Sequence, residues 1–138
     1  MVHALREIHG VLEPGGILVD ARPDTRVVAY AERRKPRGFQ RYGVVKTKSS
    51  ELANALASDR SVATAVAEGL FKRRRRGRFY HRIPFANLAQ LRQYLAEHPS
   101  FDHQPDWAVD APTRRQHASD QFVIRRPVRY ELLEARHR

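Results

Sequence analysis

The sequence predicts an α/β or α+β protein that forms a single domain over residues 1–138, with a mixed sheet of about four to five strands and helices packed on it. Three observations support this class. Some segments carry apolar residues at three- and four-residue spacing, as amphipathic helices do. Others are short β-branched runs bounded by Gly or Pro, which are typical of strands. The length of 138 residues is that of one domain with one hydrophobic core.

Composition indicates a folded, basic protein. Hydrophobic residues make up 41% and charged residues 30%, a mixture unlike that of disordered chains. No apolar run reaches the roughly 18 residues that a membrane-crossing helix needs, and residues 1–12 do not form the apolar block of a signal peptide. The absence of cysteine excludes disulfides and thiolate chemistry. We therefore expect a cytoplasmic protein without membrane contact.

The first predicted unit is a helix followed by a buried strand. Apolar residues line one face of a helix over residues 2–12. Pro14-Gly15-Gly16 ends this helix, because Pro cannot continue the hydrogen-bond ladder and Gly permits a sharp reversal. The continuous apolar run Ile17-Leu18-Val19 then predicts a strand buried on both faces, as in a parallel sheet.

The remaining elements follow from periodicity and from turn residues. The chain beyond the first strand is predicted to contain a strand pair (27–31 and 39–45) with a basic tip, one helix or two short ones between Ser49 and Gly69, a strand over 78–85, a helix capped by Asn87, a loop over 100–120 and a final strand over 122–133. Pro127 in the final strand is expected at a bulge or on an edge, because it has no N–H to donate.

The opening segment carries a family resemblance. Ala4-Leu5-Arg6-Glu7-Ile8-His9 and Val11-Leu12-Glu13-Pro14-Gly15-Gly16 are similar to the "ALREIxRVLKPGG" segment of class I S-adenosylmethionine-dependent methyltransferases. In that family this segment leads into the fifth strand, here Ile17–Asp20. Residues 1–24 match well, and the rest of the chain matches in the order of its elements. The resemblance implies a partial Rossmann-like methyltransferase fold that corresponds to the C-terminal half of such an enzyme.

The family's cofactor motif is absent from this sequence. In the family a glycine-rich turn after the first strand and an acidic residue at the end of the second strand hold S-adenosylmethionine. The only adjacent glycines here, Gly15 and Gly16, match the turn into the fifth strand instead. We therefore expect no cofactor for this chain alone, and S-adenosylmethionine only if the missing half is supplied.

A strand without its flanking neighbours leaves backbone groups unpaired. In a complete fold of this family, strand 17–19 would be flanked on both sides. An exposed apolar edge favours pairing with another chain, so we expect a homo-oligomer such as a dimer, or a complementary chain along that edge. A sequence that simply begins at an internal methionine is the alternative explanation.

The basic residues are the second functional signal. The formal net charge is +11, and all but four of the 26 basic residues are Arg, whose guanidinium fits phosphate geometry. The candidate phosphate-binding residues form two clusters, namely Arg33, Arg34, Lys35 and Arg37, and Lys72, Arg73, Arg74, Arg75, Arg76 and Arg78. With Phe79, Tyr80 and His81 alongside, they are compatible with a nucleic-acid partner. The alternative is a solvated loop and hairpin tip in an arginine-rich protein.

The sequence identifies no catalytic acid–base pair. Asp20 and Arg22 follow the first strand, at the edge where α/β sheets bind ligands, although a simple salt bridge would also explain them. Tyr80 and His81 join them as candidate cleft residues by analogy with the family fold. His98, Asp102, His103 and Asp106 are close in sequence but lack the spacing of a metal site, so no metal is expected.

Two functional hypotheses result. The first is a methyltransferase-related protein, equivalent to the C-terminal part of a class I enzyme, inactive alone and acting as a self-associating or partner-completed module. The second is a basic nucleic-acid-binding module on a half-methyltransferase scaffold.

Overall fold

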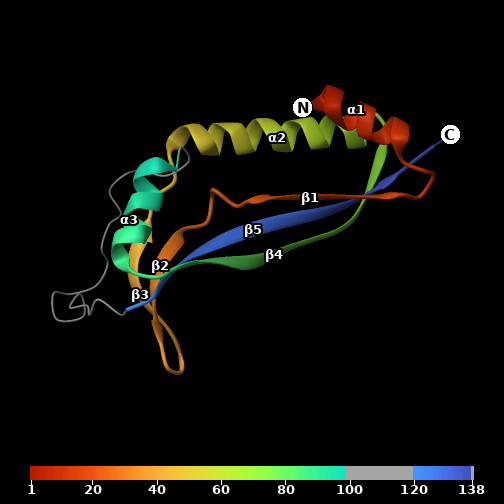
Figure 1. Ribbon diagram of the computed structural model, residues 1–138. Coiled ribbons are helices and arrows are strands. Elements are labelled where there is room, and N and C mark those ends of the chain that lie inside the picture. The colour runs from red at the N-terminus through yellow and green to blue at the C-terminus, as the bar shows by residue number, and fades with distance from the viewer. Residues whose placement is uncertain (99–119, 138) are drawn as a thin grey trace. The chain divides into compact units, whose positions relative to one another are not determined.

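The computed structural model describes residues 1–98 and 120–137 as three helices and five strands (Figure 1). Along the chain these are α1 (Val2–Val11), β1 (Ile17–Pro23), β2 (Ala29–Lys35), β3 (Gly38–Val45), α2 (Ser49–Ala67), β4 (Phe71–Phe85), α3 (Leu88–Glu97) and β5 (Phe122–Ala135). The protein is therefore of the α+β class. The predicted strand number and helix order are confirmed, while most of the predicted 100–120 loop, with Asp102, His103 and Asp106, lies outside the described residues.

The strands form one antiparallel sheet, so the predicted mixed sheet is wrong. Its order is β1-β5-β2-β3, and β4 also pairs with β5. Strand β5 changes its partner along its length, because residues 122–125 pair with β2 and residues 128–134 pair with β1. Pro127 lies between these two paired segments, in keeping with its lack of an N–H donor. The parallel pairing predicted for strand 17–19 is wrong, because its neighbour is the C-terminal strand running in the opposite direction.

Contacts divide the chain into two compact units. Unit 1 comprises Met1–Pro23, Ala53–Phe79 and Val128–Arg138, and unit 2 comprises Asp24–Leu52 and Tyr80–Pro127. Strands β4 and β5 each contribute one segment to unit 1 and another segment to unit 2. None of the described helices is long and apolar enough to cross a membrane.

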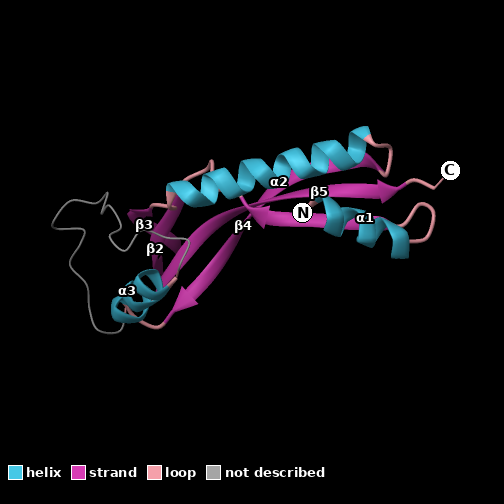
Figure 2. Cartoon of the chain, turned by 90° about the horizontal axis from the view of Figure 1, so that it is seen from above, coloured by secondary structure: helices cyan, strands magenta, loops and turns pink. Residues whose placement is uncertain are grey.

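Unit 1 packs α1 and α2 on one face of β1 and β5. Helix α2 follows β5 in both views of the chain (Figures 1 and 2). The buried core of this unit consists of Leu5, Val62, Ala65, Phe71, Leu133 and Ala135. Gly15 has a φ of 78° and donates its N–H to the Ala135 carbonyl at 3.0 Å, so the predicted Pro-Gly-Gly turn is present and attached to the end of β5.

Strand β1 is buried on one face only. Leu18 points toward the core of unit 1, whereas Ile17 and Val19 keep 48% and 58% of their surface exposed. Alternate residues of a strand point to opposite faces of the sheet. The prediction that both faces of this strand are buried is therefore wrong among the described residues, since α1 and α2 cover only the face that carries Leu18.

Unit 2 packs α3 against one face of the β2–β3 hairpin and of the adjoining segments of β4 and β5. Its buried core contains Ala29, Ala31, Tyr42, Val45, Leu88, Leu91, Leu95, Phe122 and Ile124. The predicted cap of α3 is confirmed, because the Asn87 Oδ1 accepts the Gln90 N–H at 2.9 Å. A register shift between Ala31 and Glu32 interrupts the hairpin ladder.

Candidate functional site

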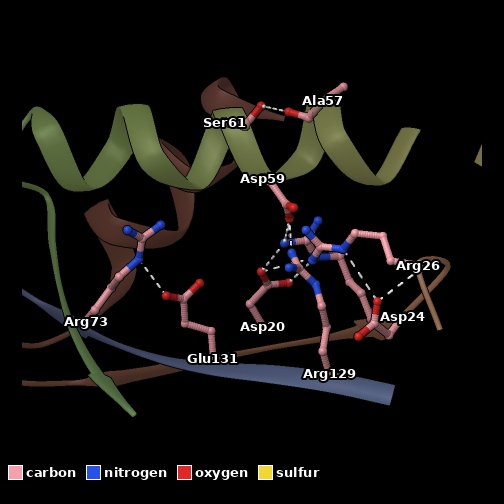
Figure 3. A network of polar contacts seen from close by, with 10 residues as sticks. Asp20, Asp24, Arg26, Ala57, Asp59, Ser61, Arg73, Arg129 and Glu131 are labelled. Atoms are coloured by element: carbon pink, nitrogen blue, oxygen red, sulfur yellow. Dashed lines mark hydrogen bonds and ion pairs between the residues drawn. The ribbon is translucent and has the colours of Figure 1, made fainter. Parts of the chain in front are cut away.

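The candidate cleft residues Asp20 and Arg22 belong to a cluster of ion pairs in unit 1. Arg22 Nη2 lies 2.8 Å from Asp20 Oδ2 and 3.0 Å from Asp59 Oδ1. Arg129 on β5 also donates to Asp59, which α2 holds above the strands (Figure 3). We call Asp20, Arg22, Asp59 and Arg129 the Asp59 cluster.

The Asp59 cluster connects elements within unit 1. Its two carboxylates face two guanidinium groups, so its formal charges balance. Between 13% and 26% of each side chain is exposed, so the pairs are partly removed from water. Such an arrangement links α2 to β1 and β5. For Asp20 and Arg22 the structure thus has the salt bridge that sequence analysis offered as the alternative.

The second basic cluster, residues 72–78, is part of strand β4 and not a loop. Phe71 at the start of the strand is buried in the core of unit 1. Arg73 and Arg74 form ion pairs with Glu131 and Glu134 of β5. The predicted strand over 78–85 is thus only the second half of β4. The first half was not predicted, because its acidic partners are about 60 residues away in the chain. An edge strand rich in cations also resists pairing with other edges.

Gly77, the glycine within this basic run, packs against the ring of Tyr130. A Cβ on Gly77 would lie 2.5 Å from the Tyr130 hydroxyl, so a side chain at this position would displace the tyrosine ring. Phe79 lies beside the same ring, with 6.3 Å between the ring centroids. Lys72, Arg75 and Arg76 remain as exposed cations on β4.

The β2–β3 hairpin buries one residue of the first basic cluster and leaves the other three exposed. Arg33 is only 6% exposed, and its guanidinium lies over the Tyr42 ring at 5.1 Å and beside Asp120 at 3.7 Å. It therefore serves the core of unit 2. Arg34, Lys35 and Arg37 are exposed on the hairpin.

The opposite face of this sheet carries a different set of side chains. Strand register places Tyr30 opposite Arg125, Glu32 opposite Arg41, and Arg34 opposite Phe39. Because residues alternate between faces, all six lie away from α3. Tyr80 and Arg82 of β4 contact this group. We call Tyr30, Arg34, Phe39, Arg41, Tyr80, Arg82 and Arg125, together with Glu32, the Arg–aromatic face.

Arginine and aromatic side chains are paired across this face. The Arg41 guanidinium carbon lies 3.7 Å from the Tyr30 ring centroid, and the same carbon of Arg125 lies 3.7 Å from the Tyr80 ring. Arg82 lies 4.3 Å from the Phe39 ring centroid. These are cation–π distances.

Of these residues only Arg34 and Tyr80 were candidates from the sequence, because the others are dispersed over four strands. The signal available in the sequence was alternation, since Tyr30, Glu32 and Arg34 occupy every second position of one strand, and Phe39 and Arg41 do so in the next. His81, the remaining candidate cleft residue, is exposed on β4 in unit 2.

His98 lies at the end of α3, with its ring centroid 5.0 Å from that of Tyr94. Burial, and then the positive charge of Arg126, lower the pKa of His98 from its ordinary 6.5, while Glu51 opposes the shift. The folded state thus favours neutral His98. Its contribution to stability is complete above the ordinary pKa and is lost as the pH falls through that value toward the lower folded pKa.

An NMR titration of the His98 ring is therefore expected to show a midpoint below 6.5. The Arg126→Gln variant should raise this midpoint, because a repelling charge is removed, and Arg126→Lys should leave it nearly unchanged. A midpoint at or above 6.5 in the unmodified protein would contradict this assignment.

No protein-family model matches the chain, and neither a curated protein nor a solved structure matches it. Within residues 1–98 and 120–137, no three His, Asp or Glu side chains are grouped to hold a metal ion. Two features remain for a functional interpretation, namely the incompletely covered strand β1 and the Arg–aromatic face.

Proposed function

We propose that this chain is methyltransferase-related and equivalent to the C-terminal part of a class I S-adenosylmethionine-dependent enzyme. It acts as a cytoplasmic module that self-associates or is completed by another chain at β1. The order of its elements supports this proposal, since a helix, a Pro-Gly-Gly turn and a strand are followed by a strand pair, a helix, a strand, a helix and a last strand. That is the order the resemblance implies.

The observation that carries the proposal is that β1 lies at the end of the sheet order and exposes apolar side chains. This strand is terminal in the sheet order, and β5 is its only strand partner among the described residues. Its other edge leaves backbone donors and acceptors without a strand, and such an edge is a template for pairing. Ile17 and Val19 add exposed apolar surface next to that edge. Covering each of these half-exposed side chains would contribute about 1 kcal/mol.

The same proposal defines what the chain does not supply. The residues that match the family are scaffold residues, and Asp20 and Arg22 are paired within the Asp59 cluster. Binding of S-adenosylmethionine is therefore assigned to the missing half. Methyl transfer requires that half to be added.

The proposal predicts a dimer in solution that depends on β1. Multi-angle light scattering over a concentration series should give twice the chain mass for the unmodified protein. The Ile17→Lys, Val19→Lys double variant should shift the equilibrium to monomer, because it places two charges where apolar side chains would be covered. Both side chains are exposed, so the fold should be retained.

The matched control is the Val11→Lys, Val28→Lys double variant. It adds the same charge at two exposed apolar positions outside β1 and should remain a dimer. A monomeric unmodified protein at every concentration would contradict self-association, and equal dissociation of the two double variants would contradict the role of β1 in it.

A further inference from the structure

We infer that the Arg–aromatic face of unit 2 binds single-stranded nucleic acid. This inference does not rest on the proposed function, because the face contains no residue of β1. It also differs from a general effect of net charge, since it assigns binding to one face of one sheet.

The charge of the face favours a polyanion. Four cations, Arg34, Arg41, Arg82 and Arg125, accompany one carboxylate, that of Glu32. Glu32 is only 8% exposed and lies 3.4 Å from Arg82, so it presents little negative charge to a ligand. Arg125 Nε is buried and has no hydrogen-bond partner in the described part of the chain. The contact given for this guanidinium is the cation–π contact with the Tyr80 ring.

The aromatic residues distinguish a nucleic acid from other polyanions. Phe39 and Tyr80 keep 41% and 39% of their surface exposed, although each lies beside an arginine. Unpaired bases stack on exposed rings and on guanidinium planes, while the phosphates between them contact neighbouring cations. Bases of a duplex are stacked inside the helix and are not available in this way. The combination therefore favours a single strand over a duplex or an acidic protein.

The arginine–ring pairs also hold the cations in place. A guanidinium group over a ring loses less side-chain freedom on binding than a free one, because it is already oriented. Strand alternation presents these pairs as a regular array on one side of the sheet. Both RNA and DNA carry the required phosphates and bases.

Fluorescence anisotropy with labelled 12-nucleotide oligo(U) and oligo(dT) tests the inference. We expect binding of at least one of them and weaker binding of a duplex of equal length. If each of the four face cations neutralises one phosphate, the logarithm of the association constant should fall with the logarithm of salt concentration with a slope of about −3.

Matched variants locate the interface. The Arg34→Gln, Arg41→Gln double variant should weaken binding at least about tenfold, because it removes two phosphate contacts from the face. Arg75→Gln, Arg76→Gln removes the same charge from exposed positions of β4 in unit 1 and should have a much smaller effect. Tyr80→Ala should weaken binding by about 5- to 100-fold, since it removes a stacking ring. Tyr80→Phe should bind nearly as the unmodified protein does.

Three results would overturn the inference. One is the absence of binding to both single strands at low salt. Another is an equal loss of affinity in the two arginine double variants, which would indicate diffuse attraction by net charge. The third is a lack of selectivity: the duplex binds as tightly as the single strand, or polyglutamate displaces the labelled strand as effectively as unlabelled single strand does. Far-ultraviolet circular dichroism of each variant excludes loss of folding as the cause.

Discussion

The Phe71→Ala variant is expected to lose about 3–5 kcal/mol in the free energy of unfolding. Phe71 is 1% exposed and packs in the core of unit 1 with Leu5, Val62 and Leu133. It is also the first residue of β4. The next seven residues, Lys72 to Arg78, are six basic residues and one glycine. Removal of the Phe71 ring leaves a cavity at the point where this cationic strand is held to the core.

Phe79 provides the matched control, since it is the same residue type on the same strand. It is 48% exposed, so Phe79→Ala should cost less than about 1 kcal/mol. Urea unfolding followed by circular dichroism measures both variants. Equal losses would show that the basic run is not anchored at Phe71 and would favour the loop that the sequence predicts there.

The Asp59→Ala variant should lower the free energy of unfolding by about 2–3 kcal/mol. Asp59 accepts from both Arg22 and Arg129, so its removal leaves two partly buried guanidinium groups, of which Arg22 keeps the Asp20 carboxylate. The expected loss is below that of a fully buried pair, because water reaches about a quarter of the Asp59 side chain.

Glu68, the residue that follows α2, supplies the comparison for Asp59. It pairs with Arg6, and the two side chains are 35% and 56% exposed. Solvent screens such a pair, so Glu68→Ala should change stability much less than Asp59→Ala does. Equal effects of the two variants in the same urea series would contradict the structural role of the Asp59 cluster.

Local sequence signals predicted where the three helices begin or end. Pro14-Gly15-Gly16 predicted the end of α1, Asn87 predicted the start of α3, and Gly69 predicted the end of α2. Each of these depends on backbone conformation or on a hydrogen bond within a few residues. Such signals are carried by the segment itself.

Features that depend on distant residues were not predictable in the same way. The direction of the strand beside β1 depends on β5, more than 100 residues later in the chain. The basic run forms a strand because Glu131 and Glu134 compensate part of its charge. The Arg–aromatic face was missed for a related reason, since it exists only when register brings residues of several strands together.

The two units of the chain carry different candidate features. In unit 1, several ion pairs link the elements to one another, and among the described residues β1 has a strand on one edge only and two exposed apolar side chains. In unit 2, the core is complete on the side of α3, and the other side of the sheet is rich in arginine and aromatic side chains. A protein-completed strand and a nucleic-acid-binding face are compatible within one molecule, and each is tested separately.

Hydrogen–deuterium exchange of residues 17–23, as a function of chain concentration, tests most directly the claim that β1 pairs with a second copy of the chain. If another copy pairs with β1, the amides of this strand should become more protected as the concentration rises, while those of β2, which already has strands on both sides, should not change. Exchange in β1 that is independent of concentration from the lowest to the highest value would contradict the claim.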